Sequence, residues 1–150
     1  MVPIMMDHFD RLLKCAAFLI ALVVVWGFSG QGLAQNGQTA DEGPLTQADL
    51  DAYVYLLPKM AEVKGGTPEE MAIVLRESGL TRRRAAYVVT KVFLAQSLAQ
   101  GLSSPDQMIE ENVPLYLRPS TEEITLVNNN LTSLFQAQSA ARRAAGQPPQ

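Results

Sequence analysis

The sequence predicts an all-α fold, and three observations carry this prediction. Apolar residues recur at helical spacing over most of residues 46–145. A Ser or Thr precedes each of these stretches, and an acidic residue or a proline follows in most of them, which is typical of a helix start. No segment alternates apolar and polar residues as a strand would. We expect a small helical bundle of four main helices plus one short helix.

The first helix is predicted to begin at Thr46. Asp49 lies three residues further on, as in a capping box, and places an acidic group at the positive end of the helix. Pro58 lacks a backbone donor, so we expect it to kink or end the helix near Leu57. The apolar face comprises Leu50, Tyr53, Val54, Leu57 and Ala61.

Two further helices follow in residues 67–99. Thr67 and Pro68 form a typical helix start, and Gly79 supplies the left-handed residue with which helices often end. Thr81 begins the third helix, which we expect to reach Gln100. This helix is apolar over most of its circumference, which predicts a central position in the bundle. In pattern alone, residues 67–99 resemble a helix-turn-helix.

The last third of the chain contains a short helix and a long one. Ser104 and Pro105 begin the short helix, and two prolines then enforce an extended or turning connection up to residue 119. Ser120 and Glu123 form the capping box of the last helix. Residues 128–130 are three asparagines, which weaken this helix and are expected to face solvent. Its apolar face comprises Ile124, Val127, Leu131, Leu134, Phe135 and Ala141.

The N-terminus resembles a bacterial secretion signal. Residues 15–28 are almost entirely apolar, Arg11 and Lys14 precede them, and small residues follow up to Ala34. The apolar run is too short to span a bilayer comfortably. We therefore predict a signal peptide over residues 1–34 cleaved after Ala34, a flexible leader over 35–45, an all-α domain over 46–145, and a disordered tail over 146–150. Translation from a methionine at position 1, 5 or 6 fits this pattern.

Removal of residues 1–34 limits the chemistry of the mature chain. The single Cys, His and Trp of the sequence all lie in this segment. A Ser-His-Asp triad, a cysteine nucleophile, histidine ligation of haem and an ordinary zinc site are then excluded. We predict no catalytic residue, no cofactor and no metal site, and hence no enzyme. The net charge of −3 gives no general attraction to nucleic acid.

Pairs of carboxylates that are close in sequence could serve catalysis, but helix starts explain most of them. Acidic groups in a first turn are stabilised by the helix dipole, and neighbouring side chains point in different directions. A glycosidase would need two carboxyls that face each other across a cleft. The pairs are Asp49/Asp51, Glu69/Glu70, Glu110/Glu111 and Glu122/Glu123.

A basic cluster at the start of the third helix is the main candidate for partner binding. Arginines at this position would contact DNA in a helix-turn-helix, but a solvated basic face that pairs with nearby glutamates is the simpler interpretation. An exposed tyrosine on the first helix and another in the proline-bounded connection are candidate anchors. The candidate partner-binding surface is Arg82, Arg83, Arg84, Tyr55 and Tyr116.

These observations favour a small exported protein, periplasmic or secreted, that binds or scaffolds other envelope proteins without catalysis. The expected partner is another envelope protein or a second copy of the chain, and no nucleic acid is expected. Contact with the membrane is transient through the signal segment, or permanent if it is not cleaved. One alternative is a DNA-binding helix-turn-helix in residues 67–99, if the N-terminus is not a signal. Another is an envelope enzyme that uses carboxylates.

Overall fold

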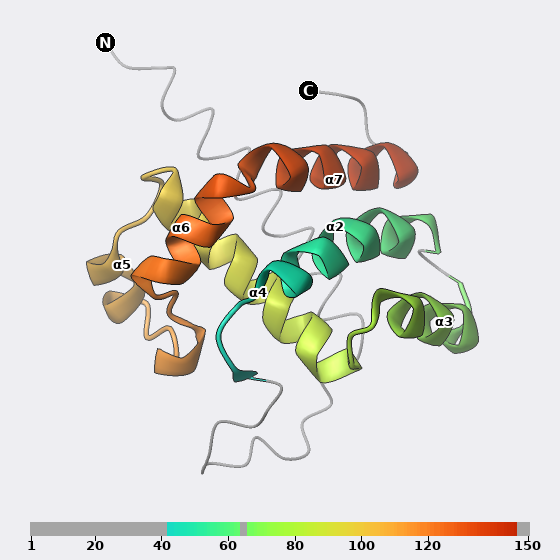
Figure 1. Cartoon of the computed structure of the whole chain (residues 1–150), viewed down its shortest axis with the longest axis horizontal. Helices are drawn as coiled ribbons and strands as arrows, with labels where there is room; N and C mark the ends of the chain where they lie inside the picture. The colour runs from blue at the N-terminus through green and yellow to red at the C-terminus, as the bar shows by residue number, and fades with distance from the viewer. Residues whose placement is uncertain (1–41, 64–65, 147–150) are drawn as a thin grey trace. The chain divides into compact units, whose positions relative to one another are not determined.

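A computed structural model describes residues 42–63 and 66–146, and in these residues the protein is entirely helical. It has six α-helices there, five of them at least seven residues long, one 3-10 turn and no strand (Figure 1). The all-α prediction is confirmed. The predicted signal segment 1–34, residues 35–41 of the leader and residues 147–150 of the tail lie outside the described residues.

The helices follow one another through short connections. None of those in the described part of the chain is long and apolar enough to cross a membrane. In chain order the elements are α2 (Gln47–Glu62), α3 (Pro68–Ser78), α4 (Arg82–Ala99), α5 (Pro105–Glu110), the 3-10 turn η2 (Leu115–Leu117), α6 (Thr121–Asn129) and α7 (Leu131–Ala144).

The predicted helix starts are confirmed in detail. At each of five starts a hydroxyl side chain accepts a hydrogen bond from the backbone N–H three residues on, which satisfies a donor that the helix itself leaves unpaired. Gly79 ends α3 with a φ of 77°, a conformation that favours glycine. The five capping residues are Thr46, Thr67, Thr81, Ser104 and Ser120.

The prediction of four main helices is wrong in one respect, because the last helix is two helices. It breaks at Asn130, which ends α6 and begins α7 with a φ of −111°. The Asn130 side chain donates to the backbone carbonyl of Leu126 and exchanges hydrogen bonds of 3.1 Å with Gln47. Asparagine side chains compete in this way with the helical backbone bonds, so the break occurs without a glycine or a proline.

Pro58 does not end α2 near Leu57, which was one of the two outcomes expected of it. The helix continues to Glu62 with the proline inside it. Met60 and Ala61, which follow the proline, are both buried. The burial of this last turn compensates for the backbone hydrogen bond that Pro58 removes.

The helices pack around two contacts that are seen in Figure 1. The most extensive one joins α2 to α7, and the next joins α4 to α6. α4 also packs against α2 and against η2, whereas α2 contacts α3, α4 and α7, so the central position predicted for α4 is shared with α2. The fully buried residues that fill these contacts include Leu50, Tyr53, Val88, Val92, Val127 and Leu134.

The end of the predicted leader belongs to the folded unit. Residues 42–45, which we call the strap, precede the Thr46 cap and contact α4 through the hydrogen bonds described below. Leu45 is buried, and its N–H donates to Glu123 of α6. The strap is thus held by groups far from it in sequence, which no local pattern in the leader could indicate.

Candidate functional site

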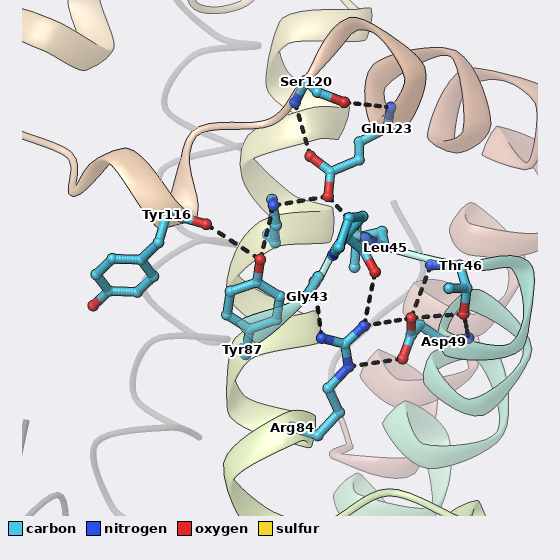
Figure 2. Close-up of polar contacts among 11 residues, drawn as sticks. Gly43, Leu45, Thr46, Asp49, Arg84, Tyr87, Tyr116, Ser120 and Glu123 are labelled. Carbon is cyan, nitrogen blue, oxygen red and sulfur yellow. Dashed lines mark hydrogen bonds and ion pairs between the residues drawn. The ribbon is translucent and has the colours of Figure 1, made fainter. Parts of the chain in front are cut away.

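The three predicted surface arginines lie at the start of α4 but have different surroundings. The side chain of Arg84 is only 13% exposed, and it forms a two-pronged ion pair with Asp49 of α2. Nη2 lies 2.7 Å from Oδ2 and Nε lies 3.0 Å from Oδ1 (Figure 2). Arg83 is 45% exposed and pairs with Glu42 of the strap at 2.7 Å. Arg82 is exposed.

Arg84 also binds the strap through its main chain. Its Nη1 donates to the carbonyl oxygen of Gly43 at 2.9 Å, and its Nη2 donates to that of Pro44 at 3.0 Å. The guanidinium carbon lies 5.1 Å from the centre of the Tyr87 ring, within the range of a cation–π contact. The rigid fork of an arginine suits this task, because its donors point to several acceptors at once.

Asp49 is the anion that orients Arg84. Burial raises the pKa of its carboxyl, but hydrogen bonds from Arg84 and Thr46 and the charge of Arg84 outweigh this effect. The pKa of Asp49 is therefore lowered from its ordinary value of 3.8. One carboxylate thus serves both as the capping-box acid of α2 and as the partner of α4.

A second ion pair lies deeper, between Lys91 of α4 and Glu123 of α6. Both residues are buried, and Nζ lies 2.7 Å from Oε1. Lys91 also donates to the hydroxyl of Tyr87 at 2.8 Å, and that hydroxyl donates to the carbonyl of Tyr116 at 3.2 Å (Figure 2). These contacts connect α4 to both α6 and η2.

Glu123 is the junction of the network. Its Oε1 accepts from Lys91 and from the N–H of Leu45, and its Oε2 accepts from the N–H of Ser120 at 2.7 Å. A buried charge is tolerated only when it is paired and its lone pairs are satisfied, and both conditions are met here. The sequence predicted only the bond to Ser120.

Lys91 is buried, although lysine side chains are mostly exposed in folded proteins. One signal in the sequence indicated this burial. Lys91 lies three residues after Val88 and four before Ala95, and therefore falls in the apolar stripe of its helix. A lysine in an apolar stripe needs a buried anion. Its position in sequence did not reveal that Glu123 supplies it.

The two candidate tyrosines lie in different surroundings. Tyr55 is exposed on α2, and its hydroxyl donates to Glu77 of α3 at 2.7 Å. This hydrogen bond to a carboxylate raises the pKa of Tyr55. Tyr116 is half-buried in η2, with its carbonyl toward Tyr87 and its ring directed away from it (Figure 2). Through Tyr87 the backbone of Tyr116 is linked to Arg84, whereas Tyr55 pairs with α3.

The two most exposed of the large apolar side chains lie close to Tyr116 in the sequence, a feature that the sequence analysis missed. Ile109 at the end of α5 is 55% exposed, and Leu115 in η2 is 78% exposed. The connection that carries them is fastened to the core by buried Met108 and by the bond to the Tyr116 carbonyl. Arg118 fastens it internally by donating to the carbonyl of Val113 at 2.8 Å. We call Ile109, Leu115 and Tyr116 the connection surface.

Two further observations concern the acidic side chains and the exposure of α4. Within residues 42–63 and 66–146, no three acidic side chains come together as metal ligands would. In α4, the recognition helix of a helix-turn-helix, every side chain of residues 84–99 is buried or half-buried. A helix that reads DNA needs several exposed side chains to reach the base edges.

Comparison with known proteins places the chain in no family: no family model, no curated protein and no solved structure matches it. Two features of the described residues therefore remain as candidates for function. One is the ionic network that holds the strap, and the other is the connection surface.

Proposed function

We propose that the protein is an exported, non-catalytic helical domain that binds another protein of the bacterial envelope through the connection surface. The observation that carries this proposal is the exposure of Leu115 and Ile109 on a segment fastened to the core. Large apolar side chains that project from a fixed backbone are typical anchors of protein interfaces. Tyr116, which follows Leu115 in the chain and is half-buried, adds an aromatic residue to this segment.

The fastening of the segment supports a role in binding. A flexible loop loses conformational entropy when a partner orders it, and this loss subtracts from affinity. Bonds to the carbonyls of Tyr116 and Val113 already hold this connection in place. Burial of Leu115 and Ile109 against a partner would therefore contribute to binding with a small ordering cost.

The pairing of the buried charges supports a role without catalysis. Asp49, Lys91 and Glu123 are the buried charged residues of the described part, and each is in an ion pair inside the fold. Catalytic acids and bases face a cleft in which substrate reaches them. Here the same groups hold helices and strap together, which gives them a structural use.

The DNA-binding alternative has less support. It would use the arginines at the start of α4, but Arg84 is committed to Asp49 and the strap, and Lys91 is buried with Glu123. Only Arg82 and Arg83 remain on the exposed surface of this turn. The export pattern of residues 1–34, on which our proposal rests, would also separate the protein from the chromosome.

Localisation is the first test. The full chain with a C-terminal tag is produced in its own organism, the cells are fractionated, and the N-terminus is read by mass spectrometry. We expect a chain that begins at Gln35 in the periplasm or the medium. An intact chain in the cytosol would overturn the proposal, and DNA retention by that chain would establish the alternative.

The second test addresses the connection surface. A photo-crosslinking amino acid replaces Leu115 in living cells, and the matched control places it at Phe135, which is an exposed apolar residue of α7. We expect a discrete crosslinked protein from position 115 that is absent from position 135. The additional change Ile109→Glu should remove this product. Identical products from both positions would contradict a partner site at the connection.

A further inference from the structure

Negative charge dominates the part of the chain that carries the connection surface. From residue 92 to residue 141 the sequence has five acidic residues and one basic residue. The basic residue is Arg118, which is half-buried and donates to the carbonyl of Val113. One of the acidic residues, Glu123, is neutralised by Lys91. The other four are exposed, so this part of the protein has a negative surface: Asp106, Glu110, Glu111 and Glu122.

The carboxylates of α5 and its C-cap do not stabilise the fold. No ion pair or side-chain hydrogen bond within the described residues involves Asp106, Glu110 or Glu111. Glu110 is the last residue of α5 and Glu111 is its C-cap, where the helix carbonyls carry a partial negative charge that repels an anion. Neighbouring like charges also repel each other. The stability of the fold therefore does not account for these two glutamates.

A closed turn follows α5 and fixes the backbone there. Asn112 adopts a left-handed φ of 55°. Its N–H donates to the carbonyl of Ile109 at 3.0 Å, and the N–H of Val113 donates to the carbonyl of Met108 at 2.9 Å. This pair of bonds is a common way to end a helix, and asparagine is one of the residues that tolerate it. The end of α5 therefore presents its side chains from a fixed backbone.

The dimensions of an ordinary interface bring the apolar and acidic side chains under one partner. Glu110 and Glu111 lie between Ile109 and Leu115 in the chain. Leu115 is four residues after Glu111, a distance of at most about 14 Å even in a fully extended chain. An interface of standard size buries about 800 Å² of each partner, which is roughly 30 Å across. A partner that covers Leu115 therefore also meets the two carboxylates.

We propose that the connection surface binds a cationic amphipathic segment of a partner protein. Apolar side chains of that segment cover Ile109 and Leu115, and its lysines or arginines pair with Glu110 and Glu111. Nucleic acid and anionic lipid carry the wrong charge for this surface, so a protein segment is the partner that fits. This inference rests on the proposed function, because it states the chemistry of the partner at the same surface.

Synthetic peptides test this chemistry with the purified protein. One peptide has leucines on one helical face and lysines on the other, a second has glutamates in place of the lysines, and a third has serines in place of the leucines. An apolar photo-crosslinking amino acid at position 115 records binding. We expect the leucine–lysine peptide to crosslink several-fold more than either of the others. Equal crosslinking of either of them would overturn the proposal.

Position 135 is the matched control site. Phe135 is 43% exposed, but residues 124–146 contain no acidic residue. We expect several-fold less crosslinking of the leucine–lysine peptide from position 135 than from position 115. Similar yields from the two positions would show that the peptide binds any exposed apolar side chain, and would refute a specific site.

The carboxylates are tested by Glu110→Gln/Glu111→Gln in the chain with the crosslinker at position 115. This change should lower the yield several-fold, and added salt should do the same for the unchanged chain, because ions screen exposed charges. The matched control Glu69→Gln/Glu77→Gln removes equal charge from exposed side chains of α3, at the opposite end of the bundle from α5 (Figure 1). Circular dichroism verifies that both variants are folded. An unchanged yield in the first variant, or an equal loss in the control, would contradict the proposal.

The same substitutions in living cells separate this inference from the proposed function. If position 115 yields its discrete crosslinked protein and Glu110→Gln/Glu111→Gln leaves that yield unchanged, the cationic partner is refuted and the proposed function stands. A several-fold loss of the product would support both. Absence of any product from position 115 would refute the proposed function, and the peptides would then decide the charge preference of this surface by themselves.

Discussion

The contact between α2 and α7 and the contact of α4 with α6 and the strap are built from different chemistry. The first is mainly apolar, with Leu50, Tyr53 and Leu134 fully buried. Among its polar contacts, Gln138 of α7 donates to the hydroxyl of Tyr53 and to Gln96 of α4. The second contains the buried ion pair of Lys91 with Glu123 and the junction at Glu123, and a further ion pair with Asp49 of α2 orients the Arg84 side chain that binds the strap.

The difference indicates a division between stability and specificity. Apolar burial is favourable in many relative orientations, so it stabilises the α2–α7 contact without defining every detail of it. An ion pair is favourable only when both partners and their hydrogen bonds are in place, and otherwise it leaves a buried charge. The network around α4 therefore fixes where the strap and α6 lie, and variants of each contact should respond differently.

The largest loss is expected for Glu123→Gln, which leaves Lys91 buried without its anion. Breaking a buried ion pair costs about 4 kcal/mol of unfolding free energy. Urea unfolding followed by circular dichroism measures the loss. The double variant Lys91→Met/Glu123→Gln should be more stable than Glu123→Gln alone, because no unpaired charge remains. Equal stability of the two variants would show that the ion pair does not define this contact.

The apolar contact should be weakened almost as much by Leu134→Ala. Truncation of a fully buried leucine removes apolar burial and leaves a cavity, for a loss of about 3 kcal/mol. Phe135→Ala is the matched control, because Phe135 is the next residue and is 43% exposed. The same unfolding assay should register a much smaller change for it. Similar losses at both positions would contradict the burial pattern of α7.

A smaller loss is expected for Arg84→Lys, which keeps the charge but not the fork. Lysine cannot bind Asp49 with two prongs and reach both strap carbonyls, and we expect a loss of about 2 kcal/mol. Arg83→Lys is the adjacent control, since the Arg83 side chain is 45% exposed and an ion pair near the surface contributes little. Hydrogen exchange at Leu45 should accelerate in the Arg84 variant and not in the control.

The smallest expected effect is the pH dependence of stability that comes from Asp49. The pKa of Asp49 is lower in the fold than in the unfolded chain, so the unfolded chain binds the proton more tightly. The stability that this carboxylate contributes is present above its ordinary pKa of 3.8 and is lost as the pH falls through the lower folded value. Asp49→Asn should be less stable than the natural protein at pH 7, and the difference should shrink toward pH 3. A constant difference would exclude this linkage.

Local signals in the sequence were sufficient to locate the helices. The hydroxyl caps, Pro68 and Gly79 act on backbone groups within a few residues, so their effects can be read from neighbouring positions. Local signals did not locate the break of the last helix at Asn130. It depends on a hydrogen bond to Gln47, which is 83 residues away. Nothing within the asparagine run distinguishes the residue that would find this partner.

The candidate site was predicted less well, because its residues depend on distant partners. Arg84 was recognised as part of a basic cluster, but Asp49 and the strap withdraw most of its side chain from the surface. Leu115 was not among the predicted surface residues, because leucine is one of the residues most often buried. Only the fold shows that it projects from the surface.

The α2–α7 contact has a consequence for when this protein folds during its synthesis. Gln138 of α7 donates a hydrogen bond to Tyr53 of α2, and the two residues are 85 positions apart in sequence. The packing of α2 therefore cannot be completed before α7 has been made. Contacts of such long range form slowly, and a ribosome adds roughly 5–20 residues per second. For several seconds, therefore, α2 has been made without the helix that covers it. The core around α2 is therefore completed only after α7 has been synthesised.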